Sequence, residues 1–431
     1  MKHIFTLFIS IFIITISNAQ DFVTQNGEQL QLNGAPYYFV GTNYWYGSLL
    51  SLQKDPNRGI KRLRNELDFL KNKGITNLRI VAGAEDTGVV SGVERIGPPL
   101  QKTKGIFDTS VIRGLDMLLY EMSKRDMKAV IYLSNNWEWS GGWLQYLKWN
   151  HRISDSLFTA KMDWDLMRDE ISKFYECEPC ITDYLNQVAF VMDHTNSISG
   201  TKYINDPTIM AWQMANEPRP MRPSEINAYE NWVEKTASFI KSKDKNHLLS
   251  IGTEGYIGTE NKTVFHKIHD NKNIDYLTIH IWPKNWQWFT GKDLTAAMDT
   301  ILSMTSNYIE YHKDVAQELK KPLVIEEFGL PRDGFSFDIY ASTKGRDTYF
   351  KNILQKWSAD KKSNGVIAGI NFWAYGGIAK PIPGQLFWKQ GDDYMGDPPM
   401  EEQGLYSIFN SDKSTWKVIK RFTTTSKRKK K

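Results

Sequence analysis

Two short segments of this 431-residue chain place glutamates where acid–base and nucleophilic chemistry can be done. The first, WQMANEPR at 212–219, contains Glu217, and the second, LVIEEFG at 323–329, contains Glu326 and Glu327. Two carboxyl groups are what hydrolysis of a glycosidic bond requires. One is protonated and donates to the departing oxygen, while the other is ionised and attacks the anomeric carbon. Different surroundings would hold the two carboxyls in these two states.

Residues of the kinds that bind sugars follow these and other apolar runs. Asn216 directly precedes Glu217, and we expect its amide to hydrogen-bond a sugar hydroxyl, whereas Gly329 after Glu327-Phe328 would let substrate approach closely. The other candidates for substrate binding are Arg79, Arg219, Glu254, His280, Trp282 and Trp373. Six further tryptophans are candidates for the walls of a cleft: Trp137, Trp139, Trp143, Trp286, Trp288 and Trp388. Taken singly, each of these side chains is also compatible with an ion pair or with core packing.

Eight short apolar runs precede the candidate residues and alternate with helical patterns. Several runs are apolar on both faces, as buried parallel strands are, and a stripe of leucines such as Leu63, Leu67 and Leu70 indicates helices that face a sheet. This alternation predicts an α/β fold, a (β/α)₈ TIM barrel, with the active site at the carboxyl ends of the strands. The expected strands are Tyr38–Trp45, Asn77–Ala82, Ala129–Leu133, Ile209–Met214, Leu248–Gly252, Tyr276–His280, Leu323–Glu326 and Gly369–Trp373. The expected helices are Ile60–Lys73, Val111–Arg125, Ile181–Thr195, Ser224–Lys241, Leu294–Lys320 and Arg346–Lys361.

The two ends of the chain differ from its body. A positive start, an apolar run from Ile4 to Ile16 and the small residues up to Ala19 predict a signal peptide over residues 1–19 and export of the protein. The apolar run is too short for a comfortable membrane span. Asn26-Gly27 predicts a tight turn in a short β-hairpin over residues 22–36, which we expect to close the barrel floor. Residues 20–425 are then one catalytic domain, and 426–431 a basic, disordered tail.

Charge and composition narrow the classes of function. The formal net charge is +5, but Lys427–Lys431 at the extreme end supply five positive charges, which leaves a neutral body. A nucleic-acid-binding protein carries its basic excess on the folded surface, so this class is disfavoured. Asp392-Asp393 resembles no metal-binding loop, and we expect neither a metal nor another cofactor. We expect the exported protein to be a monomer.

The chain has two cysteines, Cys177 and Cys180, in the segment ECEPC. Export permits a disulfide between them. Two reduced thiols are the alternative. A redox or metal site is the least favoured interpretation, because a lone C-x-x-C lacks a second pair of ligands.

The two glutamate segments, taken as a pair, resemble the acid/base and nucleophile motifs of glycoside hydrolase family 5. NNWEWSGGW at 135–143, GTEGYIG at 252–258 and GDDYMGDPPMEEQGLYSIFNSD at 391–412 are similar to the endo-β-1,4-mannanase branch of that family. The resemblance covers nearly the whole chain after the signal peptide. It implies Glu217 as acid/base and Glu327 as nucleophile. It also implies that Arg219 binds the leaving side of the substrate and that Arg79, His280 and Trp373 belong to the site.

Glu326 and Trp282 each allow more than one interpretation. Neighbours on a strand point to opposite faces, so one of Glu326 and Glu327 should enter the barrel mouth. The family motif selects Glu327 and leaves Glu326 as a structural carboxylate between barrel and helices. The family usually has a tyrosine two residues after the histidine, whereas this chain has Trp282, whose indole N–H donates but does not ionise. Trp282 therefore either replaces that hydroxyl as a donor or stacks on a sugar.

The expected function is that of a secreted, retaining endo-β-1,4-mannanase acting on mannan, glucomannan or galactomannan. An endo-β-1,4-glucanase of the same family is the nearest alternative, because it would share both glutamates. A catalytically silent polysaccharide-binding protein is the alternative from another class. The complete set of catalytic residue types argues against it.

Overall fold

The computed structural model describes residues 22–423 of the chain. The predicted signal peptide, residues 1–19, and the predicted tail, residues 426–431, lie outside the described residues. All eight predicted strands are present, each within two residues of its expected start. They are β4 (Phe39–Asn43), β5 (Asn77–Val81), β10 (Lys128–Tyr132), β11 (Ile209–Gln213), β12 (Leu248–Ser250), β13 (Leu277–Ile281), β14 (Leu323–Phe328) and β15 (Ile367–Phe372).

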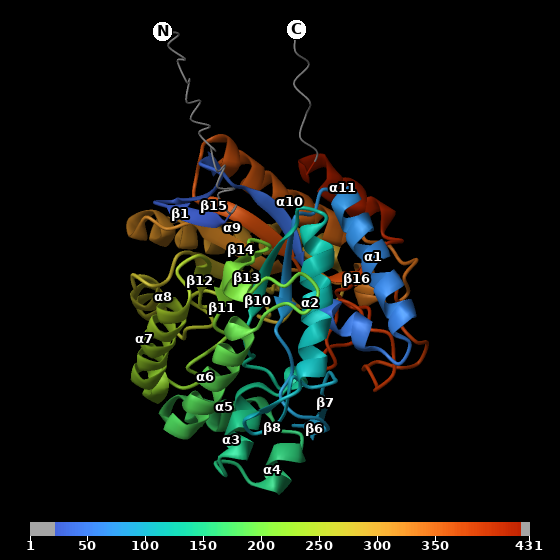
Figure 1. Ribbon diagram of the computed structural model, residues 1–431. Helices are drawn as coiled ribbons and strands as arrows, with labels where there is room; N and C mark the ends of the chain where they lie inside the picture. Colours follow the sequence, from blue (N-terminus) through green and yellow to red (C-terminus); the bar gives the residue numbers. More distant parts are fainter. Residues whose placement is uncertain (1–21, 424–431) are drawn as a thin grey trace, which may run out of the picture.

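The eight strands form one parallel sheet that curls into a barrel (Figure 1). Their order is β12-β11-β10-β5-β4-β15-β14-β13. The two end strands are joined by backbone hydrogen bonds from Asp275 N to Leu249 O, 2.9 Å, and from His280 N to Glu254 O, 3.0 Å. Almost every strand residue is buried, which explains the continuous apolar runs in the sequence. The predicted (β/α)₈ barrel is confirmed.

Helices surround the barrel, and the six predicted ones are all present. In α1 (Pro56–Asn72) the leucine stripe at Leu63, Leu67 and Leu70 is fully buried against the sheet. The carboxylate of Asp55 caps this helix by accepting from Arg58 N, 3.1 Å, with Pro56 in the first turn. The other predicted helices are α2 (Thr109–Ser123), α6 (Glu178–Asp193), α7 (Ile226–Lys243), α9 (Leu294–Leu319) and α10 (Lys344–Lys362). The sequence pattern missed the short α8 (Lys262–His269) and the last described helix, α11 (Lys413–Thr423).

The predicted N-terminal hairpin is β1 (Val23–Asn26) and β2 (Gln29–Leu32), and a third short strand, β3 (Ala35–Pro36), extends it into a small antiparallel sheet. Val23 and Leu30 are buried against residues at the amino ends of the barrel strands, among them Phe39, Val130 and Met210. The small sheet thus closes the barrel floor. Figure 1 shows it at the end of the barrel opposite to α3, α4 and β6–β8.

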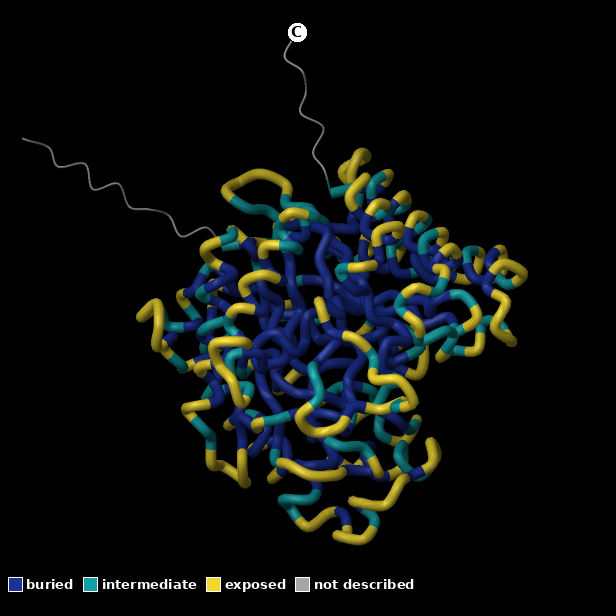
Figure 2. Tube along the Cα trace, turned by 90° about the vertical axis from the view of Figure 1, so that its right-hand side faces the viewer, coloured by how far each residue is buried: buried dark blue, intermediate teal, exposed yellow. Residues whose placement is uncertain are grey.

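The carboxyl ends of the strands carry the longest connections, and these build the walls above the barrel. Figure 2 shows the buried barrel interior in dark blue, surrounded by exposed loops. These connections contain β6 (Val89–Val90), β7 (Val93–Glu94), β8 (Gln101–Thr103), β9 (Ile106–Phe107), α3 (Gly142–Trp149), α4 (Asp155–Thr159), α5 (Trp164–Ser172), β16 (Tyr375–Gly377) and β17 (Ile408–Phe409). Within residues 22–423, every helix is too short or too polar to cross a lipid bilayer.

Candidate active site

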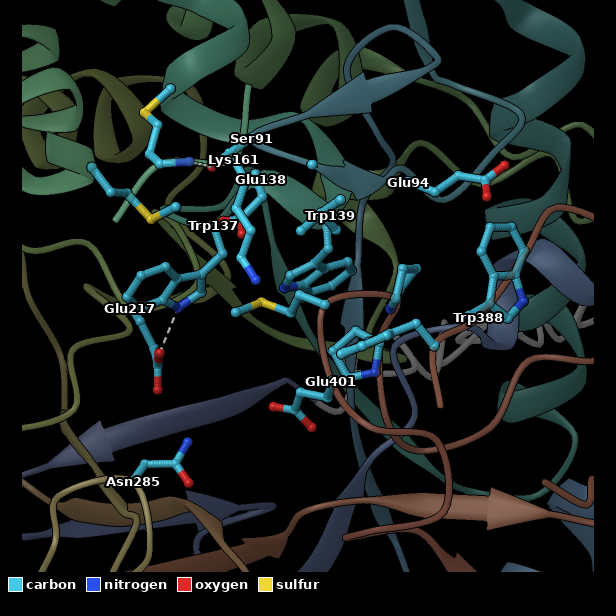
Figure 3. Close-up of a pocket in the computed structure, with 18 of the residues that line it drawn as sticks. Ser91, Glu94, Trp137, Glu138, Trp139, Lys161, Glu217, Asn285, Trp388 and Glu401 are labelled. Atoms are coloured by element: carbon cyan, nitrogen blue, oxygen red, sulfur yellow. Dashed lines mark hydrogen bonds between the residues drawn. The ribbon is translucent and has the colours of Figure 1, made fainter. Parts of the chain in front are cut away.

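A cleft of about 1220 Å³ opens at the carboxyl ends of the barrel strands. Glu217, Glu254 and Glu327 line it together with several tryptophans. Figure 3 shows Glu217 in this cleft with Trp137, Trp139 and Trp388. The structure therefore brings the two glutamate segments, 110 residues apart in the chain, to one site. This is where the barrel fold places catalytic residues.

Glu217 follows β11 in a left-handed backbone conformation, with a φ of +50°. Its N–H donates to Gly252 O, 2.9 Å, which fixes this unfavourable turn from the neighbouring strand end. The carboxylate is 7% exposed and is held at both oxygens. Oε1 lies 2.6 Å from Nδ1 of His280, and Oε2 accepts from the indole N–H of Trp137, also at 2.6 Å.

Glu327 is on β14, and its carboxylate is 2% exposed. Oε1 accepts from Arg79 Nη1 at 2.6 Å, and Oε2 lies 3.3 Å from Nδ1 of His280. The Arg79 guanidinium is fully buried on β5, where Gln213 and Asn216 accept its other protons at 2.6–2.8 Å. Arg79 therefore presents one fixed N–H to Glu327 rather than a mobile charge.

His280 lies between the two carboxyl groups and couples their protonation. Burial lowers the pKa of His280, but the charge of Glu327 and the hydrogen bond with Glu217 outweigh this effect and raise the pKa to about 9. Burial would raise the pKa of Glu217, yet the hydrogen bond and charge of His280 lower it to about 2. Burial raises the pKa of Glu327 to about 8, opposed by the charge of His280 and supported by that of Glu217. These opposite shifts favour a single proton shared between the two carboxyls at neutral pH.

Glu217, His280 and Glu327 offer oxygen and nitrogen atoms that all lie within 4.8 Å of one another. They form the only such group of possible metal ligands among residues 22–423. The two carboxyl groups are therefore close enough to act on the same glycosidic bond.

The interpretation of Glu326 as a carboxylate between barrel and helices is wrong. Its side chain is 1% exposed, and Oε2 accepts from Gln213 Nε2 at 2.6 Å inside the barrel, 3.4 Å from Arg79 Nε. The register of β13 and β14 shifts just before this position, so that His280 pairs with Glu327. This irregularity breaks the simple alternation and turns both glutamates toward Arg79. Glu327 alone of the two lines the cleft.

The structure also places the other predicted polar residues at the site. Asn216 is held between Arg79 and Asn135, whose Oδ1 accepts from its amide at 3.2 Å. Arg219 makes a two-pronged ion pair with Glu254, with 2.6 Å from Nη2 to Oε1 and a second contact from Nε to Oε2. Both residues line the cleft beside Glu217.

Trp282 and Trp373 form one wall of the cleft near Glu327. Their rings meet edge to face at 5.8 Å, and Trp282 also meets Tyr406 at 5.1 Å. Among residues 22–423, no hydrogen bond joins the Trp282 indole to Glu327, whose partners are Arg79 and His280. The indole of Trp373 donates to Glu401 at 3.3 Å instead. Burial, with the charge of Asp397, raises the pKa of Glu401 well above its usual range.

The six further tryptophans divide between cleft and core. Trp137, Trp139, Trp286 and Trp388 line the cleft. Trp143 is fully buried and stacks on Phe174 at 4.0 Å. Trp288 packs against Trp286 and Tyr308 outside the cleft lining. Sequence alone could not separate these cases, because stacking on a sugar and packing in a core use the same residue type.

Sequence reasoning missed several residues of the site. Gln213 and Asn43 hold Arg79, and Glu401 faces the cleft beside Trp373. Gln213 is two residues beyond Ala211 on the inner face of β11. Strand alternation from Ala211 would have marked Gln213 as pointing into the barrel. Glu401 is in a loop, where no periodicity exists.

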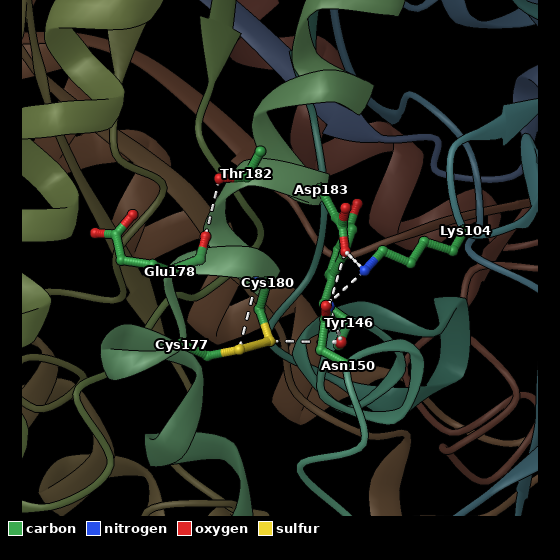
Figure 4. Close-up of a disulfide and its surroundings, with 8 residues drawn as sticks. All are labelled: Lys104, Tyr146, Asn150, Cys177, Glu178, Cys180, Thr182 and Asp183. Atoms are coloured by element: carbon green, nitrogen blue, oxygen red, sulfur yellow. Dashed lines mark hydrogen bonds and ion pairs between the residues drawn. A yellow bond between two sulfur atoms is a disulfide. The ribbon is translucent and has the colours of Figure 1, made fainter.

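Cys177 and Cys180 are joined by a disulfide at the start of α6 (Figure 4). Both residues are buried, and the Cys180 sulfur contacts Tyr146 O at 3.5 Å. The bridge spans one turn at the helix N-terminus, where Cys177 also caps the helix by accepting from Cys180 N. Figure 4 shows it beside Tyr146 of α3, and neither cysteine is among the residues that line the cleft.

A barrel whose strands end in two close, buried carboxyls beside tryptophan walls defines a glycoside hydrolase. Residues 20–431 match the model of a family described as GH family 5 beta-mannosidase-like. The chain belongs to glycoside hydrolase family 5.

Characterised relatives and solved structures agree with this assignment. The chain is 32% identical over 373 residues to mannan endo-1,4-beta-mannosidase 5 of Solanum lycopersicum, covering 83% of this chain and 81% of that protein. It is 30% identical over 378 residues to mannan endo-1,4-beta-mannosidase 1 of Arabidopsis thaliana, covering 84% and 83%. The crystal structure of a family 5 mannosidase from Rhizomucor miehei superimposes with a TM-score of 0.83 at 29% identity, covering 94% of this chain and 97% of that one.

Proposed function

We propose that this protein is a secreted, retaining endo-β-1,4-mannanase that hydrolyses internal linkages of mannan, glucomannan or galactomannan. The observation that carries the retaining mechanism is the spacing of Glu217 and Glu327, whose nearest carboxylate oxygens lie within 4.8 Å. Retaining enzymes hold their carboxyl groups about 5–5.5 Å apart, whereas inverting enzymes need about 6.5–9.5 Å to admit a water molecule. The names of the plant relatives support β-1,4-mannan as the substrate.

In this proposal Glu327 attacks the anomeric carbon while Glu217 protonates the glycosidic oxygen. The bond to the leaving chain breaks as the bond to Glu327 forms, which gives a covalent mannosyl-enzyme. Glu217, now ionised, takes a proton from water, and the resulting hydroxide displaces Glu327 from the anomeric carbon. The sugar then leaves with its original configuration. Arg79 stabilises the Glu327 carboxylate both before attack and on release.

The proton shared by the two carboxyls must lie on Glu217 when substrate is bound. His280 Nδ1 contacts both groups, at 2.6 Å and 3.3 Å, and so offers a path between them. It donates its proton to Glu217 and takes one from Glu327, which leaves His280 unchanged. A glycosidic oxygen that accepts a hydrogen bond from protonated Glu217 favours this arrangement.

The decisive experiment is the product distribution from linear β-1,4-mannan, with carboxymethyl cellulose as the competing substrate. We expect a mixture of manno-oligosaccharides from mannan and little release from the cellulose derivative. Efficient release from the cellulose derivative would favour the endo-β-1,4-glucanase alternative. Mannose as the sole product would indicate cleavage from a chain end rather than at internal linkages. No release from any β-glycan would leave the polysaccharide-binding alternative.

The stereochemistry is tested separately by proton NMR at the start of the reaction. We expect the β-anomer to appear first, because two displacements restore the original configuration. An α-anomer as the first product would exclude double displacement.

We also propose that the two ends of the chain lie outside the catalytic domain. Residues 1–19 act as a signal peptide cleaved after Ala19, residues 20–425 form the catalytic domain, and residues 426–431 form a basic tail. Arg219, Glu254, Asn216, His280, Trp282 and Trp373 bind the polysaccharide, without a cofactor, in a monomer. N-terminal sequencing of exported protein tests the cleavage site, and its mass in solution tests the oligomeric state.

A further inference from the structure

Trp164 is a large aromatic side chain that stands half out of the protein at the edge of the cleft. It is the first residue of α5, is 49% exposed, and lines the cleft. A single exposed tryptophan needs no explanation by itself. Its neighbours, however, connect it to the catalytic residues.

The Trp164 ring faces Arg219 and Trp137. The guanidinium carbon of Arg219 lies 5.7 Å from the centre of the Trp164 ring and 5.1 Å from that of Trp137, and the two rings are 6.2 Å apart. Arg219 is itself held by Glu254 in the two-pronged ion pair. The three pairwise distances are similar, so the two indole rings and the fixed guanidinium form a compact cluster, of which Trp164 is the exposed member. The guanidinium carbon of Arg168 also lies 6.0 Å from the centre of the Trp164 ring.

The helix that carries Trp164, α5, is attached to the segment that contains Glu217. Arg168 on α5 donates to Met221 O at 2.6 Å, and Arg222 donates to Asp165 O at 2.8 Å and to Asp169 Oδ1 at 2.6 Å. These bonds clamp α5 onto the loop that directly follows Glu217. The position of Trp164 is therefore set relative to the acid/base rather than left to a mobile loop.

The position of this cluster relative to Glu217 indicates which part of a substrate it would contact. Trp137 contacts Glu217 at Oε2, whereas His280 and Glu327 lie on the side of Oε1. In the proposed mechanism the attacked sugar rests against Glu327, and the leaving chain continues past Glu217 on its other side. That side is occupied by Trp137, Arg219 and Trp164.

We propose that Trp164 is a stacking platform for a sugar of the leaving chain, beside Arg219, whose place on that side the family resemblance implies. The exposed half of the Trp164 side chain offers apolar ring surface to a mannose ring, and the planar guanidinium of Arg219 supplies N–H groups in a fixed direction. This inference rests on the proposed function. It adds a substrate-binding residue that the glutamate motifs and the loops resembling mannanases do not contain.

The test compares two substrates on Trp164→Ala and on the wild type. Mannohexaose places sugars on the leaving side, whereas 4-nitrophenyl β-mannobioside places only a nitrophenol there. We expect kcat/KM on mannohexaose to fall roughly 10-fold, a loss in the range of single aromatic stacking contacts, and to stay within about twofold on the nitrophenyl substrate. Trp164→Phe should recover much of the activity on mannohexaose.

Tyr340→Ala is the matched control, because Tyr340 is an exposed aromatic residue, 81% accessible, outside the cleft. It should leave both rates unchanged. Equal losses on both substrates in Trp164→Ala, or no loss on mannohexaose, would overturn the proposal. If the wild type itself cleaved no β-mannan, the proposed function would fail instead, so the two failures are distinguishable.

Discussion

The indole N–H of Trp137 donates to Oε2 of Glu217 across 2.6 Å, in a site where the glutamate is almost completely buried. A donor stabilises the ionised carboxylate and lowers its pKa. In the proposed mechanism Glu217 must begin protonated, so this bond opposes the first step and favours the second, in which Glu217 acts as a base. Trp137 therefore sets the balance between the two roles of one carboxyl group.

Trp137→Phe should raise the pKa of Glu217 by removing this donor. Because loss of the proton shared by Glu217 and Glu327 governs the alkaline limb of the rate profile, we expect that limb to move upward by about one pH unit. The measurement is kcat/KM on mannan as a function of pH. Trp139→Phe is the control, since Trp139 packs against Trp45 at 5.4 Å, whereas the hydrogen-bond partners of the Glu217 carboxylate among residues 22–423 are Trp137 and His280. An alkaline limb that stays in place in Trp137→Phe would show that the indole does not tune Glu217.

Alanine variants of the three glutamates should separate their roles. Glu327→Ala should remove nearly all activity and all covalent labelling of the enzyme. Glu217→Ala should lose roughly 100- to 10,000-fold on mannan, but the first step should remain fast with a nitrophenyl leaving group, which needs no acid. Single-turnover kinetics on both substrates measure these effects.

Glu326→Ala completes the series and should keep measurable activity. Its carboxylate bonds Gln213 and lies near Arg79, so its loss should weaken the support of Arg79 without removing a reacting group. An inactive Glu326→Ala beside an active Glu327→Ala would reverse the assignment.

The fold could be predicted from the sequence because each barrel strand is a buried apolar run and six of the surrounding helices show a helical period. The glutamate motifs then followed from their positions at strand ends. The irregular parts could not be predicted. The register shift beside His280 turns Glu326 inward, and no local sequence pattern predicts this shift.

Loop residues escaped prediction for a different reason. Trp164 and Glu401 lie in connections whose course depends on long-range contacts, such as the bond from Arg168 to Met221 O. Side-chain types in these loops show what could bind a sugar. The three-dimensional arrangement alone shows which of them face the cleft.

Glu138 provides a test of buried charge in the cleft wall. It is 4% exposed, its Oε2 has no hydrogen-bond partner, and burial raises its pKa from 4.5 to about 7. A raised pKa means that the folded state keeps a proton that the unfolded state loses above pH 4.5. The contribution of Glu138 to the free energy of unfolding is therefore fully present below pH 4.5. It falls as the pH rises toward 7 and is constant above that pH, with a total loss of about 3 kcal/mol.

Glu138→Gln should remove this loss, because glutamine stays neutral. The free energy of unfolding in urea is measured at pH 5 and pH 8 for both proteins. The difference between the two pH values should be smaller in the variant by up to about 3 kcal/mol. Equal pH dependence in both proteins would contradict burial of a neutral Glu138.

The disulfide should stiffen one turn rather than hold the barrel together. Cys177 and Cys180 are three residues apart, so the bridge closes a very small loop and removes little entropy from the unfolded chain. The double variant Cys177→Ser, Cys180→Ser should keep most activity and lose at most about 2–3 kcal/mol of stability. Thermal unfolding and mannan hydrolysis measure both. A variant that fails to fold would show that the turn is essential to the barrel.

Trp282 occupies the position where a tyrosine donor to the nucleophile was expected from the family pattern. In the structure its ring packs edge to face on Trp373 and Tyr406, and Glu327 receives its hydrogen bond from Arg79. Loss of an indole donor would raise the pKa of Glu327 and move the acidic limb of the rate profile upward. Since no such bond is present among the described residues, we expect Trp282→Phe to leave the acidic limb unmoved and to keep much of the stacking.

Trp282→Ala should weaken substrate binding by roughly 1–3 kcal/mol, the range of aromatic stacking on a planar ring. The acidic limb of Trp282→Phe decides the question, because a shift in that limb requires a donor at Glu327, whereas a sugar platform changes binding alone.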